Sequence, residues 1–215
     1  MDLRLSYLEE LNSNRHDLHI PGLLRLRMLD KKILRLFYGF DKWHVSKRFQ
    51  RPYVSEIINY INNLPEKHRN KVCEIGVGLG DILRNIDCKE KTFLESDIKA
   101  LEACRFLSKI RNKGNGKKSF SIFTFPGSQL TDKYDVIIMV NWIHAIDPET
   151  LNSNLINYFN NNLLPGGCII LDSVEAEFAN YHHDFKKFTE QTKVIRKELR
   201  DIFVFGRRIR IFEKP

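Results

Sequence analysis

Residues 72–81 read VCEIGVGLGD, and this stretch decides the fold. An apolar strand with a glutamate near its end leads into three glycines at alternate positions, Gly76, Gly78 and Gly80. Glycine lets the backbone turn sharply and approach a ligand where any Cβ would clash. A helix that begins near Gly80 would point its unpaired N–H groups at that ligand. The stretch therefore predicts a strand, a turn that binds a small ligand with an anionic part, and a helix.

The glycine spacing argues against a nicotinamide or flavin site. The dinucleotide-binding loop follows G-x-G-x-x-G, which requires a glycine where this chain has Asp81. From Glu74 to Gly80 the chain reads E-x-G-x-G-x-G. This pattern resembles the signature of class I S-adenosylmethionine-dependent methyltransferases.

Three further stretches are similar to that family in order and spacing. They are FLESDI at 93–98, YDVIIMVNWIH at 134–144 and LLPGGCIILD at 163–172. They resemble the family's second strand, its fourth strand with the loop over the reacting methyl, and the turn before its fifth strand. The resemblance covers residues 53–215. It implies a Rossmann-like, doubly wound α/β sheet of seven strands in the order 3-2-1-4-5-7-6.

The hydrophobic pattern predicts the individual elements. Strands are expected near 72–75, 92–97, 119–125, 134–140 and 167–172, and helices near 53–63, 79–87, 98–111, 149–162 and 174–189. Alternating residues at 202–205 and 208–212 flank a turn at Gly206-Arg207 and predict a terminal antiparallel hairpin.

The length of 215 residues allows one sizeable α/β domain and an appendage. We divide the chain into an N-terminal helical appendage, 1–52, and an S-adenosylmethionine-binding domain, 53–215. The formal charge of +8 is concentrated in the appendage, which holds 11 Lys and Arg against 6 Asp and Glu. Residues 23–40 predict a basic amphipathic helix after the Pro21-Gly22 breaker. Its apolar face either packs on the catalytic domain, or the helix is attracted to an anionic substrate or membrane surface.

The stretch FDKWH at 40–44 gathers two aromatic rings, a carboxylate and an imidazole in one short turn. In one interpretation Phe40 and Trp43 fill the seam between appendage and core. In the other, Trp43 and His44 contact the substrate, because aromatic faces stack on sugar rings or bases. This stretch is also similar, over fewer residues, to small bacterial methyltransferases of surface-polysaccharide gene clusters.

The resemblance implies S-adenosylmethionine as the cofactor and assigns residues to each part of it. Glu74 would lie near the methionine ammonium, and the backbone of Gly76, Gly78 and Gly80 near the methionine portion. The carboxylate of Asp97 would accept hydrogen bonds from both ribose hydroxyls. The remaining assignments are Ile98 against one adenine face, Ser128 near the adenine amino group, and Asn141 and Trp142 at the end of the fourth strand. No metal ligands are assigned.

An alcohol is a poor nucleophile until its proton is removed, and imidazole suits that task. His144, just past the fourth predicted strand, is our first candidate for the base; the alternative is that it only packs or hydrogen-bonds the cofactor loop. His182 and His183 are weaker candidates.

The acceptor follows less directly from the residues. Methyltransferases that act on amino groups of bases or glutamine often carry N/D-P-P-Y/F after the fourth strand, where this chain reads NWIH at 141–144. This counts against that group. Because the FDKWH stretch resembles methyltransferases of surface-polysaccharide gene clusters, we favour O-methylation of a small molecule or a sugar or glycan precursor. An RNA methyltransferase is the alternative that the basic N-terminus suits, although we find no RNA-binding module. A non-catalytic binding module with the same fold is a third reading.

Four cysteines lie in apolar patterns without C-x-x-C spacing or an export signal, which favours buried thiols in the cytoplasm. No apolar run reaches the roughly 18 to 20 residues that span a bilayer. We expect no transmembrane segment, and at most peripheral contact with a membrane.

Overall fold

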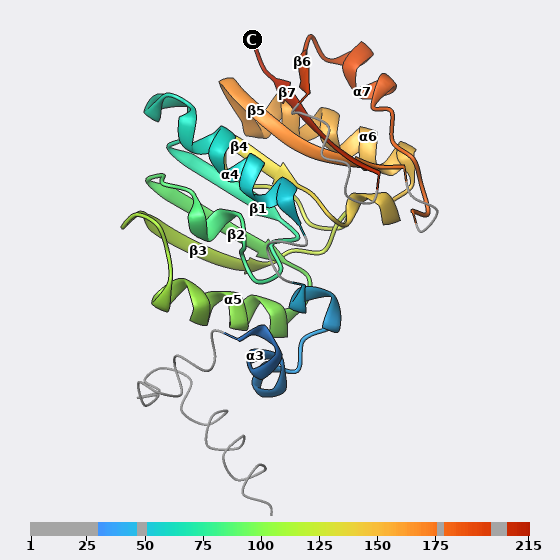
Figure 1. Ribbon diagram of the computed structural model, residues 1–215. Helices are drawn as coiled ribbons and strands as arrows, with labels where there is room; N and C mark the ends of the chain where they lie inside the picture. The colour runs from blue at the N-terminus through green and yellow to red at the C-terminus, as the bar shows by residue number, and fades with distance from the viewer. Residues whose placement is uncertain (1–29, 47–50, 176–178, 199–205) are drawn as a thin grey trace, which may run out of the picture.

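The computed structural model describes residues 30–46, 51–175, 179–198 and 206–215. Figure 1 shows one twisted sheet with helices packed against it. The seven strands have the order β3-β2-β1-β4-β5-β7-β6, which confirms the predicted fold class and strand order. The strands are β1 (Lys71–Ile75), β2 (Glu90–Glu95), β3 (Lys117–Ile122), β4 (Tyr134–Met139), β5 (Leu163–Val174), β6 (Ile195–Glu198) and β7 (Arg207–Glu213).

Strands β1 to β5 are parallel, and β7 runs antiparallel to both β5 and β6. The carboxyl ends of the parallel strands therefore lie along one edge, where open α/β sheets bind their ligands. The first predicted arm of the terminal hairpin, 202–205, lies outside the described residues. In the described part, β7 pairs with β5 along one edge and with β6 along the other.

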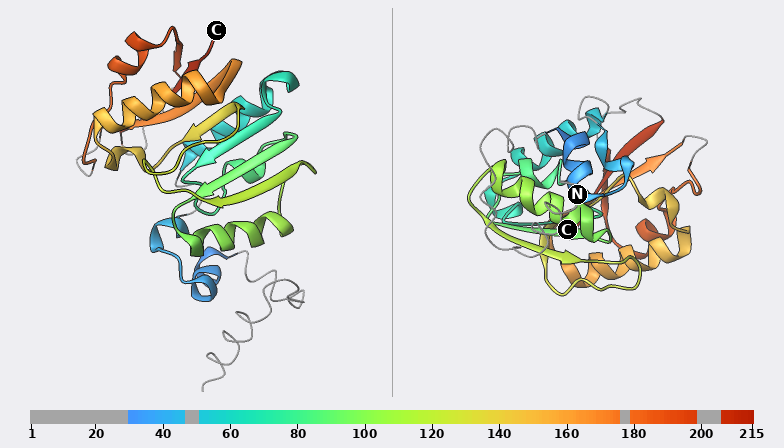
Figure 2. Two further views of the ribbon diagram at one scale, coloured as in Figure 1. Left: turned by 180° about the vertical axis from the view of Figure 1, so that it is seen from behind. Right: turned by 90° about the horizontal axis from the view of Figure 1, so that it is seen from below.

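Helices cover both faces of the sheet (Figures 1 and 2). The helices are α3 (Lys31–Tyr38), α4 (Pro52–Asn63), α5 (Ile98–Ile110), α6 (Pro148–Asn157) and α7 (Lys186–Gln191). Residues of α4 and α5 pack with Val72, Val136 and Ile170 on one face. Residues of α6 and α7 pack with Cys73 and Ile137 on the other. This alternation along β1 and β4 is the two-residue period of a strand covered on both faces.

The helix predicted near 79–87 is absent from the described structure, which has turns and a short 3₁₀ segment, Leu83–Asn85. An α-helix would join the Leu83 N–H to the Leu79 carbonyl. Instead, the Leu83 N–H donates to the Glu74 carboxylate (3.0 Å), and the Leu79 carbonyl accepts from Arg84 Nε (2.9 Å). Side chains have taken both backbone groups, so the turn after the glycines presents no helix N-terminus to a ligand.

The helix predicted at 174–189 is also wrong over most of its length. Strand β5 stays paired with β7 to its end at Val174, and α7 begins only at Lys186. Between them, the Tyr181 N–H donates to the His144 carbonyl (3.0 Å), and His183 Nε2 lies 2.9 Å from the Ile143 carbonyl. Bonds to the loop after β4 thus replace the bonds of a helix.

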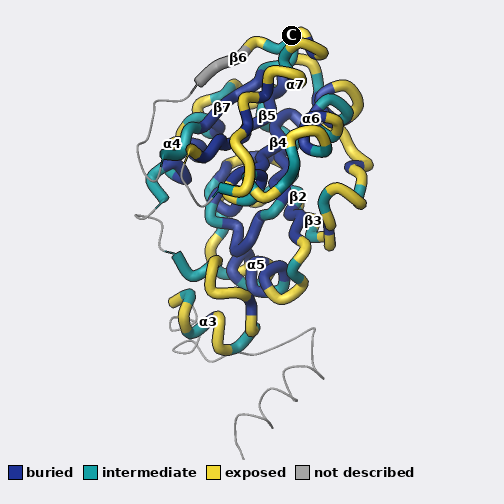
Figure 3. The backbone as a smooth tube through the Cα atoms, turned by 90° about the vertical axis from the view of Figure 1, so that its right-hand side faces the viewer, coloured by how far each residue is buried: buried dark blue, intermediate teal, exposed yellow. Residues whose placement is uncertain are grey.

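The appendage packs on α5 through a small apolar cluster (Figures 1 and 2). Leu34 and Phe40 are buried there against Ala103 and Leu107, while the other residues of α3 are partly or fully exposed (Figure 3). Helix α3 ends at Gly39, whose left-handed φ of 70° turns the chain back. Of the helix predicted over 23–40, the part before residue 30 lies outside the described residues, and the division at residue 52 stays a prediction. Across the described residues, no helix has the length and apolar character needed to cross a membrane.

Candidate functional site

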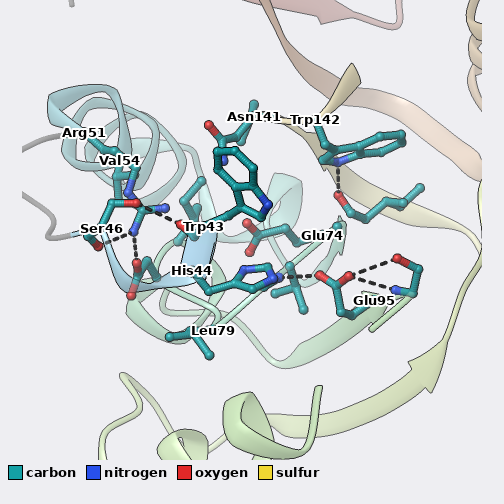
Figure 4. A pocket seen from close by; sticks show the side chains of 18 of the residues that line it. Trp43, His44, Ser46, Arg51, Val54, Glu74, Leu79, Glu95, Asn141 and Trp142 are labelled. Carbon is teal, nitrogen blue, oxygen red and sulfur yellow. Dashed lines mark hydrogen bonds and ion pairs between the residues drawn. The ribbon is translucent and has the colours of Figure 1, made fainter. Parts of the chain in front are cut away.

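A pocket of about 690 Å³ lies at the carboxyl ends of β1, β2 and β4 (Figure 4). This volume is within the usual range for small-molecule sites. Two sets of residues face each other across it. The strand wall consists of Glu74, Gly76, Gly78, Glu95, Asn141 and Trp142, and the N-terminal wall consists of Trp43, His44, Ser46 and Arg51.

Two of the three predicted glycines line the pocket. Gly76 and Gly78 have φ of 73° and 53°, a conformation that L-residues with a side chain rarely adopt. A Cβ on Gly76 would collide with the indole of Trp142, and one on Gly78 would lie 2.7 Å from His44 Nδ1. Gly80 does not line the pocket. A Cβ on Gly80 would lie 2.8 Å from Cys104 Sγ of α5, so the glycine makes room for this side chain. Gly80 therefore serves packing against a helix.

Glu74 is buried at the end of β1 and lines the pocket, as predicted from its position. Burial raises its pKa to about 8, and the charges of Asp81 and Glu95 act in the same direction, against the hydrogen bond from the Leu83 N–H. At neutral pH the side chain is therefore mostly protonated. A cationic ligand group beside it would favour the carboxylate form.

The acid of β2 that reaches the pocket is Glu95, and Asp97 does not line it. Glu95 Oε2 accepts a hydrogen bond from the Gly78 N–H (2.7 Å), and Oε1 accepts one from the Ser96 N–H (2.9 Å). The Asp97 carboxylate instead accepts from the Lys99 N–H (2.8 Å) and caps the start of α5. Because β2 ends at Glu95, the chain has already turned toward the helix at Asp97.

The two residues assigned to adenine do not reach the pocket either. Ile98 is 52% exposed on the first turn of α5. The Ser128 hydroxyl closes a turn by accepting from the Thr124 N–H (3.0 Å). The apolar rings of Phe123 and Phe125 line this end of the pocket instead.

Asn141 and Trp142 do line the pocket, and hydrogen bonds hold both in place. Asn141 has a left-handed φ of 77°, and its N–H donates to the buried carboxylate of Asp172 (3.0 Å). Trp142 Nε1 donates to the Ile75 carbonyl (2.8 Å), which lays the indole over Gly76. The loop after β4 is therefore fixed against the end of β1.

The N-terminal wall is tied to the glycine turn through Asp81. Its carboxylate pairs with Lys31 of α3 (2.6 Å), with Arg51, and with Arg84 (3.4 Å). Burial acts to raise the pKa of Asp81, but the three cations outweigh it and lower that pKa overall. Lys31 and Arg51 also donate to the Ser46 carbonyl, at 2.8 Å and 3.1 Å. The residue that breaks the dinucleotide pattern is thus the anchor of the appendage.

The structure separates the two aromatic residues of the 40–44 stretch. Phe40 is buried in the seam against α5, which matches the structural interpretation. Trp43 is 72% exposed and lines the pocket together with His44, so it does not fill the seam. In Figure 4 both side chains extend from the N-terminal segment toward Glu74 and Glu95.

His144 lines the pocket and is half-buried. Burial lowers its pKa below 6.5, and the charges of Arg207 and His183 lower it further. The imidazole is therefore neutral near pH 7, the form that accepts a proton. His182 and His183 do not line the pocket; their rings contact the Val174 and Ile143 carbonyls.

Three residues that line the pocket were not predicted from the sequence: Glu95, Arg51 and Arg207. Glu95 could have been predicted, because it directly follows the apolar residues of the strand. Asp97 directly precedes a helical pattern, which is typical of a helix cap. Arg51 and Arg207 gave no such signal, because one lies at the boundary of the appendage and the other in a predicted turn. No group of three or more His, Cys, Asp or Glu among the described residues could hold a metal ion.

No protein-family model matches the sequence, and no curated protein matches it. Solved structures with the same fold are found. The N-methyltransferase NodS from Bradyrhizobium japonicum WM9, in complex with S-adenosyl-L-homocysteine (SAH), has a TM-score of 0.63 at 14% identity over 86% of this chain and 97% of that one. Magnesium protoporphyrin IX methyltransferase from Synechocystis PCC 6803 with bound SAH has 0.62 at 15% identity, over 86% and 100%. At such low identity these likenesses show the fold, which is that of class I methyltransferases.

Proposed function

We propose that this chain is an S-adenosylmethionine-dependent methyltransferase. The observation that carries the proposal is the glycine turn of Gly76 and Gly78 between two strand-end acids, Glu74 and Glu95. It occurs at the edge of a sheet with the strand order of that fold. A sulfonium nucleoside has an ammonium, a carboxylate and a ribose diol, and the pocket offers polar groups suited to each.

The residues of the pocket fit such a cofactor. Glu74 would bind the ammonium, with the Gly76 and Gly78 backbone beside the methionine portion. We assign the ribose hydroxyls to Glu95, since within the described residues its Oε2 accepts one hydrogen bond, from the Gly78 N–H, and retains acceptor capacity. The rings of Phe123 and Phe125 offer apolar surface for the adenine, in place of Ile98 and Ser128.

The cofactor, when bound, supplies a methyl group on a sulfonium. The protein's own task is to align the acceptor for in-line displacement and to exclude water. The acceptor oxygen forms the new bond to carbon while the carbon–sulfur bond breaks, and sulfur keeps the electron pair. We assign His144 as the base that takes the hydroxyl proton, because it lies in the pocket in its neutral form.

We further propose that the acceptor is a small molecule, such as a sugar or glycan precursor. The support is the exposed face of Trp43 at the pocket, which suits stacking on a ring. One structural neighbour is named as a magnesium protoporphyrin IX methyltransferase and the other as an N-methyltransferase, and one fold can serve different acceptors. Buried cysteines without a disulfide suit a reducing compartment such as the cytoplasm.

Calorimetric titration with SAH tests the cofactor assignment, and a protein that does not bind it contradicts the proposal. Incubation with methyl-labelled S-adenosylmethionine and fractionated cell extract then identifies the acceptor class. Label in a small molecule or glycan supports O-methylation of such a precursor. Label in RNA would favour the RNA methyltransferase, and SAH binding without any transfer would favour a binding module.

His144→Ala tests the base. We expect SAH affinity to stay within about twofold, and turnover on a hydroxyl acceptor to fall about 100-fold, the usual contribution of a general base. The rate of the wild-type enzyme should rise with pH with a midpoint below pH 6.5, because the pKa of His144 is lowered. A fully active variant would remove His144 from this role.

A further inference from the structure

The end of the pocket away from Glu95 contains an unusual group of cations. Arg51 and Arg207 both line it, and Arg207 is the first residue of β7, with a side chain only 9% exposed. Burial lowers the pKa of Arg207, and the positive charge of Arg51 is close enough to lower it further. Two like charges held together in a pocket repel each other unless an anion lies between them.

The acids at this end do not neutralise the cations completely. Asp172 pairs with Arg207, and Asp81 is shared among Lys31, Arg51 and Arg84. Of the three cations that share Asp81, Arg51 is the one that lines the pocket, together with Arg207. Glu74 adds little negative charge at neutral pH, because its pKa is raised to about 8 by burial.

Among the described side chains at this end, Asp172 Oδ1 and Arg207 Nη1 have no hydrogen bond of normal geometry. The same is true of two further buried atoms, the Tyr53 hydroxyl and Arg51 Nε, although the Tyr53 and Arg51 side chains interact with each other. Both can donate, and buried donors in folded proteins almost always have a partner. The Arg207 guanidinium lies over the Tyr53 ring, with its Cζ 5.1 Å from the ring centroid. These donors and the cationic excess converge on one part of the pocket.

This part of the pocket is distant from Glu95, which we assign to the ribose. It adjoins Glu74, which we assign to the ammonium and whose pKa burial raises and the charge of Arg51 acts to lower. Glu95 ends β2, on one side of β1, whereas β7 is the third strand from β1 on the other side. At about 4.8 Å between neighbouring strands, β7 lies about 14 Å from β1 across the sheet. Figure 1 shows β4 and β5 between these two strands. His144 lines the same end, near enough for the charge of Arg207 to act on it.

We propose that the methyl acceptor carries a carboxylate or a phosphate, and that this anionic group binds to Arg207, with Arg51 and the Tyr53 hydroxyl as further donors. The inference rests on the proposed function. Bound in this way, the anionic group holds the acceptor at the end of the pocket that contains His144. Asp172 is a positioning residue, since its ion pair with Arg207 and its bond from the Asn141 N–H fix the guanidinium relative to the loop after β4.

The two tryptophans of the chain, Trp43 and Trp142, both line the pocket, so intrinsic fluorescence reports on its occupancy. The protein is first saturated with SAH and then titrated with benzoate, phenyl phosphate or the uncharged benzamide. We expect at least one anionic probe to bind the SAH complex ten times more tightly than benzamide. Failure of SAH to bind refutes the proposed function and is seen before any probe is added.

Variants assign the preference to its residues. Arg207→Gln should remove the preference for the anion, while Arg208→Gln, the same change at the next residue of β7 and outside the pocket lining, should keep it. Tyr53→Phe should weaken binding of the anionic probe about threefold and leave the ion pair of Arg207 with Asp172 intact. If Arg207→Gln fails to fold because it leaves Asp172 buried and unpaired, Arg207→Gln with Asp172→Asn removes both charges.

Three results would overturn the proposal. The first is that no anionic probe binds the SAH complex more tightly than benzamide. The second is that the preference persists in a folded variant without the Arg207 charge. The third is a preference that is present in the free protein and disappears on saturation with SAH, which would show that the cations bind the carboxylate of the cofactor.

Discussion

The two walls of the pocket are built in different ways. The strand wall consists of backbone at positive φ and of acids that are buried and hydrogen-bonded, so its shape is fixed by the sheet. The N-terminal wall consists of side chains on a segment joined to the sheet domain by a small apolar cluster and by ion pairs to Asp81. Its most prominent ring, Trp43, is mostly exposed.

The difference separates two tasks. A cofactor common to a whole fold needs a site that does not vary, which strand ends and a tight turn provide. An acceptor that differs between enzymes of one fold needs surfaces that can change without disturbing the sheet. We therefore expect substitutions in the strand wall to weaken SAH binding, and substitutions in the N-terminal wall to act mainly on acceptor binding.

The largest effect should come from Gly76→Ala. A side chain at φ 73° costs about 1–3 kcal/mol, and the new Cβ would also displace the Trp142 indole. Together these should weaken SAH binding about 100-fold, measured by calorimetry. Gly127→Ala is the matched control, because its φ is not positive and its Cβ would meet only the Thr124 carbonyl, at 3.6 Å. Normal binding by Gly76→Ala would mean that the ligand does not approach this turn.

Next in size is the comparison of Glu95→Gln with Asp97→Asn, which differ by two positions and involve the same loss of charge. Glu95→Gln should weaken SAH binding at least tenfold, since each charge-assisted hydrogen bond to a ribose hydroxyl contributes about 1.5 kcal/mol or more. Asp97→Asn should leave affinity within about twofold, because Asn is also a good cap for α5. The reverse outcome would restore the assignment made from the sequence.

Titration of Glu74 should produce a smaller effect that depends on pH. The free protein holds Glu74 protonated below about pH 8, and a bound ammonium favours its carboxylate. SAH binding should therefore release a proton, and affinity should rise several-fold between about pH 6 and about pH 8. Calorimetry in two buffers with different ionisation enthalpies detects that proton. Glu74→Gln should abolish the release; if release continues in this variant, another group is responsible.

The smallest effect on SAH should come from Asp81→Asn, which removes the anchor of the N-terminal wall. Lys31 and Arg51 lose their shared carboxylate, a cost of about 2 kcal/mol for partly buried pairs. The melting temperature should fall by about 5 °C, while SAH affinity falls by about threefold or less. Glu102→Gln, in an exposed pair with Arg105, controls for the change in charge. A loss of SAH binding as large as that of Glu95→Gln would mean that the two walls are not separate.

Much of the fold was predictable from the sequence, because apolar strands bounded by turns were readable one by one. The order β3-β2-β1-β4-β5-β7-β6 followed from the resemblance. Where prediction failed, side chains had replaced backbone partners. Glu74 and Arg84 take the bonds of a helix after Gly80, and the hydrophobic pattern does not reveal that their side chains would do so.

The candidate site was predictable where residues follow a strand directly. Glu74, Gly76, Gly78, Asn141 and Trp142 all line the pocket. Asp97 shows the limit of that rule. Glu95 and Asp97 are two residues apart and would face the same side of a continuous strand, so the end of β2 at Glu95 is what distinguishes them. Arg51 and Arg207 come together from positions 156 residues apart through β7 pairing and the Asp81 anchor, which depend on the complete fold.

The attachment of α3 has a consequence for the order of assembly. Lys31 finds its carboxylate 50 residues later in the chain, and Leu34 packs on Ala100 to Leu107 of α5. A ribosome delivers this segment before any of its contacts exist, and long loops close slowly compared with local turns. We therefore expect the segment that is synthesised early to dock late, only after α5 has emerged from the ribosome.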